Sequence, residues 1–123
     1  MRDIVVEFGM NAGKVWDALN SWGSRTESQL MENTRLSAKE IHAAIGWLAR
    51  ENKIYEDGKL FKLGETNLAV KVGENAGKMW YMLHTQGESD ILHISKLAQM
   101  DESDTYSALG WLAREGKINT KAS

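Results

Sequence analysis

Gly-Trp-Leu-Ala-Arg-Glu at residues 46–51 returns unchanged at residues 110–115, a shift of 64 positions. Laying residues 1–59 over 65–123 needs no gap and gives 18 identities in 59 pairs, concentrated in this block and one other. Self-similarity at a fixed period is typical of a duplicated structural unit. The sequence therefore predicts two copies of one module, a first copy at residues 1–64 and a second at 65–123.

The other repeated block predicts the first long helix of each copy. It reads Asn-Ala-Gly-Lys-x-Trp at residues 11–16 and again at residues 75–80. Around it, apolar residues recur at positions i, i+3, i+4 and i+7, which is the stripe of an amphipathic helix. The expected N-caps are Asn11 and Asn75, and the expected helix stops are Gly23 and Gly87.

Two further helices are expected in each copy, joined by a tight turn. Thr26 to Gln29 and Ser37 to Glu40 each have the form of a capping box, and Asp90 is the corresponding cap in the second copy. The third helix is expected to be the longest. Its apolar stripe falls at Ile41, Ala44, Ile45 and Leu48, matched by Thr105, Ala108, Leu109 and Leu112.

Short strands are expected at the edges of each copy. Residues 4–8 and 68–72 are β-rich runs, each followed by a glycine. Asp57-Gly58, flanked by residues 53–56 and 59–63, predicts a two-residue hairpin with a type I′ turn. Residues 117–123 supply one strand of the equivalent hairpin, and this strand is expected to be an edge that another strand or a second subunit covers. A homodimer closed through that strand follows as a hypothesis.

A strand, three helices and a hairpin in this order predict an α+β fold made of two tandem winged helix-turn-helix modules, the second lacking a complete wing. The two repeated blocks resemble a small family of winged helix-turn-helix proteins of bacteria and archaea that is catalogued as a domain of unknown function. The resemblance covers nearly the whole chain twice. It implies the fold and an expectation of DNA binding, and it brings no catalytic residues.

The third helix of a winged helix usually enters the major groove through the face opposite its core stripe. In the first copy this face and the wing carry cations and short polar side chains that could contact double-stranded DNA. The same side chains could equally be solvated surface. The candidate nucleic-acid-binding residues are Arg35, Ser37, Lys39, His42, Arg50, Lys59 and Lys62.

The matching face of the second copy is acidic and would repel phosphate. Asp101, Glu102 and Asp104 either cap the helix, whose N-terminus favours negative charge, or contact a basic protein surface with Tyr106 as anchor. Trp22 has no aromatic counterpart in the second copy and either fills the seam between copies or anchors a partner. Asp101, Glu102, Tyr106 and Trp22 are therefore the candidate protein-interaction residues.

Other repeated residues are expected to be structural. We expect the tryptophans that both copies share to pack in the cores, namely Trp16, Trp47, Trp80 and Trp111. Gly46 and Gly110 lie within predicted helices, where glycine costs about 0.5–1 kcal/mol relative to alanine. Their presence favours close approach of another backbone at those points.

Composition narrows the function. The chain of 123 residues is 42% hydrophobic and 26% charged, carries a formal net charge of −2 and has no cysteine. These values are typical of a soluble globular protein and exclude disulfides and thiolate chemistry. Neither a signal-peptide run nor a membrane-spanning stretch is present, so a cytoplasmic location is expected.

Catalysis is not expected. The three histidines lack metal-ligand spacing, and the chain has no phosphate-binding loop, dinucleotide fingerprint or nucleophile elbow. We therefore expect no enzymatic activity, no metal, no cofactor and no small-molecule ligand. Two functions remain: a DNA-binding, transcription-associated protein that uses the first copy, or a protein-interaction or dimerisation module that binds no DNA.

Overall fold

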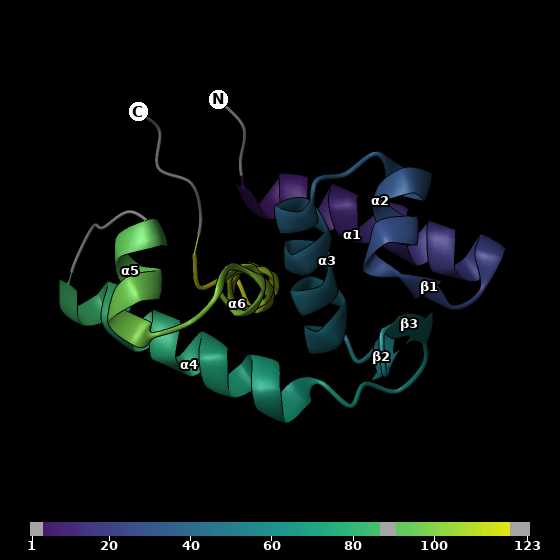
Figure 1. Ribbon diagram of the computed structural model, residues 1–123. Coiled ribbons are helices and arrows are strands. Elements are labelled where there is room, and N and C mark those ends of the chain that lie inside the picture. The colour runs from purple at the N-terminus through teal and green to yellow at the C-terminus, as the bar shows by residue number, and fades with distance from the viewer. Residues whose placement is uncertain (1–3, 87–90, 119–123) are drawn as a thin grey trace.

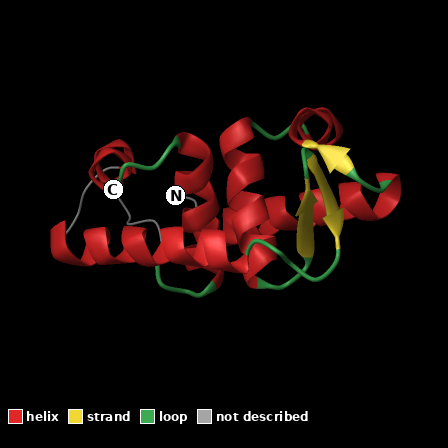
Figure 2. Ribbon diagram, turned by 60° about the horizontal axis from the view of Figure 1, so that its bottom comes forward, coloured by secondary structure: helices red, strands yellow, loops and turns green. Residues whose placement is uncertain are grey.

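The computed structural model describes residues 4–86 and 91–118. Two helices at the centre, α3 and α6, separate a side that carries α1, α2 and the sheet from a side that carries α4 and α5 (Figure 1). The three-stranded sheet lies at the end of the molecule far from α5 (Figure 2). The elements are α1 (Ile4–Trp22), β1 (Arg25–Thr26), α2 (Glu27–Thr34), α3 (Ala38–Arg50), β2 (Ile54–Asp57), β3 (Leu60–Leu63), α4 (Ala69–Gln86), α5 (Ile91–Ala98) and α6 (Glu102–Arg114).

The strands expected at residues 4–8 and 68–72 are wrong. Residues 4–8 are the first turns of α1, and most of 68–72 belongs to α4. Each run packs in the core of the other copy: Phe8 lies among residues of α4 and α6, and Val72 lies in the core of the first copy. Because that neighbouring core covers one side of each run, a helix that continues from the following stripe buries these residues. The expected caps Asn11 and Asn75 consequently lie within helices. The expectation that the third helix is the longest is wrong, because α1 has 19 residues and α4 has 18, whereas α3 and α6 have 13 each.

The sheet belongs to the first copy and has the order β1-β3-β2, with both pairings antiparallel. The hairpin is confirmed, but its two loop residues are Gly58 and Lys59, because Asp57 pairs with Leu60. Gly58 has a φ of 63° and Lys59 a negative φ, whereas a type I′ turn needs positive φ at both positions. Strand β1 was not predicted. The strand expected at residues 117–123 falls mainly outside the residues that the structure describes.

Helix ends largely follow the sequence. Thr26 and Ser37 form capping boxes at the starts of α2 and α3, and the Asp101 side chain caps α6 by accepting from the Asp104 amide. Gly23 follows α1 with a φ of 82°, as expected for a helix stop. Asp90 and Gly87 lie outside the described residues.

Two apolar cores lie on either side of the α3–α6 pair. The first contains Val15, Leu30, Ile41 and Ile54, all fully buried, together with Val72 from α4. The second contains Met79, Ile94, Leu109 and Leu112, together with Phe8 from α1. Each core therefore includes residues from the start of the other copy's long helix. This exchange of residues holds the two copies together.

The contact between α3 and α6, called the seam below, is packed backbone to backbone. A Cβ placed on Gly46 would stand 1.8 Å from the Ser107 carbonyl oxygen, and one on Gly110 would stand 1.9 Å from that of Ala43. No residue with a side chain fits at either position. The expected close approach at these glycines is confirmed, and it is the approach of one copy to the other.

The tryptophans divide into two sets. Trp47 and Trp111 are partly buried and pack against both cores. Each also occupies the space that a Cβ would need at Gly9 or Gly73, with ring atoms at 3.1 and 3.3 Å. Trp16 and Trp80 are 36% and 42% exposed, so the expectation that they are core residues is wrong. They lie at the outer margin of the stripe that faces the core.

Candidate functional site

The face of α3 opposite its core stripe is covered by α6. Ala43 is fully buried and Gly46 is buried against Ser107. His42, which was expected to reach base edges, has a side chain only 14% exposed. The surface that a winged helix usually offers to the major groove is therefore the contact between the two copies.

The repeated block accounts for this contact. Arg50 Nε donates to Glu115 Oε2 at 3.1 Å, and Arg114 Nε donates to Glu51 Oε2 at 3.0 Å. The two pairs are related by the 64-residue shift, so each copy gives an arginine and receives a glutamate. Both arginine side chains are 46% exposed, which places these ion pairs at the rim of the seam, so each contributes modestly.

The same arginines lie over the tryptophans of the opposite copy. The Arg50 guanidinium is 5.6 Å from the centroid of the Trp111 ring, and that of Arg114 is 5.8 Å from the Trp47 ring. Cation–π contacts of this kind add to the ion pairs. Arg50 was proposed to hold phosphate, but its guanidinium is engaged within the chain.

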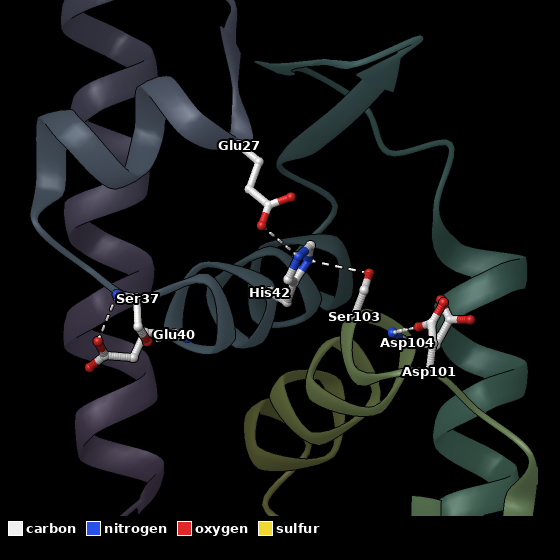
Figure 3. Close-up of polar contacts among 7 residues, drawn as sticks. All are labelled: Glu27, Ser37, Glu40, His42, Asp101, Ser103 and Asp104. Carbon is white, nitrogen blue, oxygen red and sulfur yellow. Dashed lines mark hydrogen bonds and ion pairs between the residues drawn. The ribbon is translucent and has the colours of Figure 1, made fainter.

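His42 joins three elements at one end of the seam. Its Nε2 lies 3.1 Å from Glu27 Oε1 at the start of α2, and its Nδ1 lies 3.5 Å from Ser103 Oγ at the start of α6 (Figure 3). A neutral ring protonated on Nε2 satisfies both contacts, since it donates to the carboxylate and accepts from the hydroxyl. The histidine therefore acts as a bridge between the copies.

At the position related to His42 by the 64-residue shift, the contact between the copies is of a different kind. Lys39 and Tyr106 are the counterparts of Ser103 and His42, and the Lys39 ammonium lies 5.7 Å from the centroid of the Tyr106 ring. Tyr106 is partly buried and also packs on the second core. Lys39, a candidate for DNA contact, and Tyr106, a candidate for protein contact, therefore contact each other within the chain.

A cavity of about 410 Å³ opens beside His42, between the wing, α2, α4 and α6. Its lining mixes signs of charge: Lys59 and Lys71 face it with Glu27, Glu56 and Asp104. Lys71 and Asp104 are an ion pair at 3.6 Å. The balance of charge gives no preference for a phosphate over a cation.

Among the remaining DNA candidates, only Lys59 shares a described surface with His42, because both line this cavity. The Ser37 side chain caps α3, and Arg35 ends α2 in the left-handed conformation with a φ of 63°. Lys62 on the wing lies over the Tyr55 ring at 4.7 Å. Lys59 is exposed at the hairpin loop beside the cavity.

The protein-interaction candidates are also dispersed. Asp101 is occupied as the N-cap of α6, and Glu102 in the first turn is exposed. Trp22 does not lie in the seam, so that interpretation is wrong. Its side chain is 60% exposed at the end of α1, and the Arg25 guanidinium lies 5.3 Å from its ring centroid.

Sequence reasoning missed the crossed arginine–glutamate pairs and the role of His42. The repeated Arg-Glu dipeptide was a usable signal, because identical charges in two copies of one chain can pair reciprocally. It also missed an exposed ridge on α1 around Met10, which is 64% exposed. That ridge was not predicted, because Met10 lies outside the two repeated blocks and was given no role.

No group of three or more histidine, aspartate and glutamate side chains that could hold a metal ion occurs among residues 4–86 and 91–118. Within the same ranges, no helix is both long and apolar enough to cross a membrane.

Comparison with known proteins identifies one family, whose model matches the chain twice. A family model described as a winged helix-turn-helix domain (DUF2582) matches residues 1–63 and again residues 65–123. No curated protein and no solved structure matches the chain significantly. Winged helix-turn-helix domains commonly bind DNA and are commonly non-catalytic. Because the two matches span almost the entire sequence, the chain belongs to this family of winged helix-turn-helix domains and carries two tandem copies of the domain.

Proposed function

We propose that the chain is a non-enzymatic, cytoplasmic protein-interaction module that does not read DNA through α3. One observation carries this proposal: the faces of α3 and α6 that winged helices usually turn toward bases are buried against each other at Gly46 and Gly110. Opening that seam would separate carbonyl–glycine contacts, two ion pairs and parts of both cores. A DNA duplex would have to offset all of these losses before α3 could reach its bases.

The charges also argue against DNA binding. The formal net charge is −2. Several cations that could hold phosphate already have carboxylate partners, including Arg50 with Glu115 and Lys53 with Glu51. Proteins that bind duplex DNA nonspecifically gain affinity mainly from free cations that displace counterions. The α3 face and the wing of the first copy offer few free cations close together.

The partner surface in this proposal centres on Trp22. Its large exposed ring lies beside the Arg25 side chain. Tryptophan and arginine are the residues most often found as hot spots of protein interfaces. The second copy has Gln86 at the equivalent position, so this feature belongs to the first copy alone.

Titration into random-sequence duplex DNA tests the exclusion of DNA. We expect no binding at about 50 mM salt with protein at tens of micromolar. Nonspecific DNA binders reach this affinity range through contacts between free cations and phosphates, and this chain has few such cations close together. Micromolar binding that collapses at about 200 mM salt would overturn the proposal. In that case Lys59→Ala with Lys62→Ala would identify the wing as the contact, and Lys78→Ala on α4 would be the matched control.

The Trp22 surface is tested by quantitative capture from lysate of the source cells. Trp22→Ala is expected to weaken binding of a specifically retained protein by about thirtyfold or more, the loss that defines a hot-spot residue, and so to reduce its recovery strongly. Trp80→Ala is the matched control, because Trp80 is a partly exposed tryptophan on the other copy. Equal recovery with both variants would remove Trp22 as the anchor.

A further inference from the structure

The cavity of about 410 Å³ beside His42 lies between the two copies. Its walls come from the start of α2, from α3 and from the wing of the first copy, and from the starts of α4 and α6 in the second. Small-molecule sites in proteins have volumes of about 300–1,000 Å³ and occur preferentially between domains. The size and position of this cavity are therefore those of a small-molecule site, which the sequence did not predict.

Part of the cavity wall is apolar. Four of the lining residues are buried members of the first core, namely Ile45, Phe61, Leu68 and Val72. An apolar group that displaces loosely held water from such a wall gains binding free energy. This part of the cavity favours a ligand that carries an apolar group.

Two pairs of polar groups in the lining already contact each other. Glu27 Oε1 lies 3.1 Å from His42 Nε2 (Figure 3). Lys71 Nζ lies 3.6 Å from Asp104 Oδ1. A phosphate in the cavity would meet the two carboxylates of these pairs, and a simple cation would meet the Lys71 ammonium. The pairs therefore favour a ligand without a net charge.

The wing adds one charge of each sign that has no partner. Glu56 on β2 and Lys59 in the hairpin loop both line the cavity, and neither side chain forms an ion pair in the described part of the chain. Glu56 lies opposite Phe61 in the β2–β3 register, so their side chains share the face of the sheet that borders the cavity. The 64-residue shift relates these two charges to Thr120 and Ser123, which are uncharged. Only the first copy has this pair.

A buried hydroxyl in the wall also lacks a partner. Ser107 of α6 lines the cavity and is 8% exposed, yet its hydroxyl forms no hydrogen bond among the residues that the structure describes. Buried polar side chains in folded proteins almost always have a partner. The first copy has a fully buried Ala43 at this position, so packing at the seam does not require the hydroxyl. A polar ligand in the cavity would supply the missing partner.

We propose that the cavity binds a small zwitterion with an apolar group, of which a free amino acid with an apolar side chain is the simplest. Glu56 attracts the ammonium group of the ligand, and Lys59 attracts its carboxylate. The Ser107 hydroxyl bonds to the polar end of the ligand, and the apolar group lies against the buried residues of the first core. Each charge of the ligand then has a partner of opposite sign, which neither a phosphate nor a simple cation achieves.

Isothermal titration calorimetry of the full chain with valine, leucine and phenylalanine in turn tests the inference. At least one of them is expected to bind with a Kd of about 100 μM, which is within reach of so small a ligand. The N-acetyl derivative lacks the ammonium charge and the amide lacks the carboxylate. Each derivative is expected to bind about tenfold more weakly than the free amino acid, because each leaves one charge of the wing unpaired. Inorganic phosphate is expected not to bind.

Substitutions locate the site. Glu56→Gln and Lys59→Met are each expected to weaken binding about fivefold to tenfold, since each removes one charge that contacts the ligand. Ser107→Ala, which installs the residue of the first copy, is expected to weaken it about threefold to tenfold. The matched controls are Asp57→Asn, on the opposite face of the same strand, and Lys78→Met, an exposed lysine of α4 outside the cavity. Both are expected to leave the Kd unchanged.

Three results would overturn the inference. They are no binding of any of the three amino acids at up to about 10 mM, equal affinity for the free amino acid and its two derivatives, or equal weakening by the control variants. A thermal melt of each variant verifies folding. The inference does not depend on the proposed function, because amino-acid titration and capture through Trp22 probe different surfaces.

Discussion

The two copies are most alike where they touch and most different where they face outward. Residues 46–51 and 110–115 are identical, and they supply the glycines, tryptophans, arginines and glutamates of the seam. On the outer faces, Met10 corresponds to Glu74 and Trp22 to Gln86. The repeated block therefore holds the copies together, and whatever distinguishes their functions lies on the surfaces that have diverged.

The cores differ in one instructive place. Thr105 of α6 is buried where the first copy has Ile41, and its hydroxyl bonds to the hydroxyl of Ser95 and to the Asp101 carbonyl oxygen. Ser95 in turn replaces Met31. The second copy thus has a hydrogen-bonded polar pair at a position where the first copy has only apolar packing, and the pair has changed together.

The largest expected effect comes from breaking the seam. Gly46→Ala places a methyl group 1.8 Å from the Ser107 carbonyl oxygen, so α3 and α6 must move apart. Alanine gains about 0.5–1 kcal/mol of helix propensity over glycine. Overpacking against a backbone costs more, and we expect a net loss of about 3 kcal/mol in the free energy of unfolding. Urea denaturation monitored by circular dichroism measures it.

Gly13→Ala is the matched control, because nothing within 4 Å opposes the added methyl group. It is expected to raise the free energy of unfolding of the monomer by about 0.5–1 kcal/mol. Opposite signs for the same substitution at two helical glycines would show that close approach, and not helix propensity, decides the seam. A loss of less than 1 kcal/mol at Gly46 would contradict the packing described.

Much of the fold could be predicted because it follows local rules. The capping boxes at Thr26 and Ser37, the hairpin after α3 and the apolar stripes of the helices all depend on residues close together in sequence. The repeat itself gave the division into copies. The expected close approach at Gly46 and Gly110 also followed from glycine being costly within a helix.

The errors came from contacts between the copies. Residues 4–8 are rich in β-branched side chains, but Phe8 is covered by the second copy's core, and this tertiary contact favours a continuous helix. His42 was expected on a DNA-facing surface because the opposite copy could not be placed there from sequence. A helix face that is predicted to be exposed from the sequence of one copy is buried when the other copy packs on it.

The polar pair in the second core gives an intermediate effect. Thr105→Val keeps the volume and removes the hydroxyl, which leaves Ser95 without its closest partner. Ser95 is part-buried and keeps its contact with the Met100 carbonyl oxygen, so the loss comes from the two hydrogen bonds of the Thr105 hydroxyl. Each contributes about 0.5–1.5 kcal/mol, and we expect urea denaturation to show a total loss of about 1–2 kcal/mol. Ser95→Ala combined with Thr105→Val is expected to cost little more than Thr105→Val alone, since the bond between the two hydroxyls is already lost. Additive losses in the double variant would show that the two hydroxyls do not depend on each other.

The smallest expected effect tests whether the seam is symmetric. Arg50→Ala and Arg114→Ala each remove one rim ion pair and one cation–π contact with the opposite copy. Because both arginines are about half exposed, each loss is expected to be about 0.5–1 kcal/mol, and the two are expected to be equal. Urea denaturation of the two variants makes this comparison.

Equality of the two losses is the informative part, because the copies surround these arginines with identical residues but attach them to different outer surfaces. If Arg50→Ala costs clearly more than Arg114→Ala, the wing beside α3 contributes to the first pair, and the seam is symmetric only in sequence. Glu115→Gln measured alone and with Arg50→Ala separates the ion pair from the ring contact, since the amide keeps the shape of the carboxylate. A coupling energy near zero would assign the remaining loss to the Trp111 contact, and the Arg114 pair with Glu51 must then behave in the same way for the symmetry to hold.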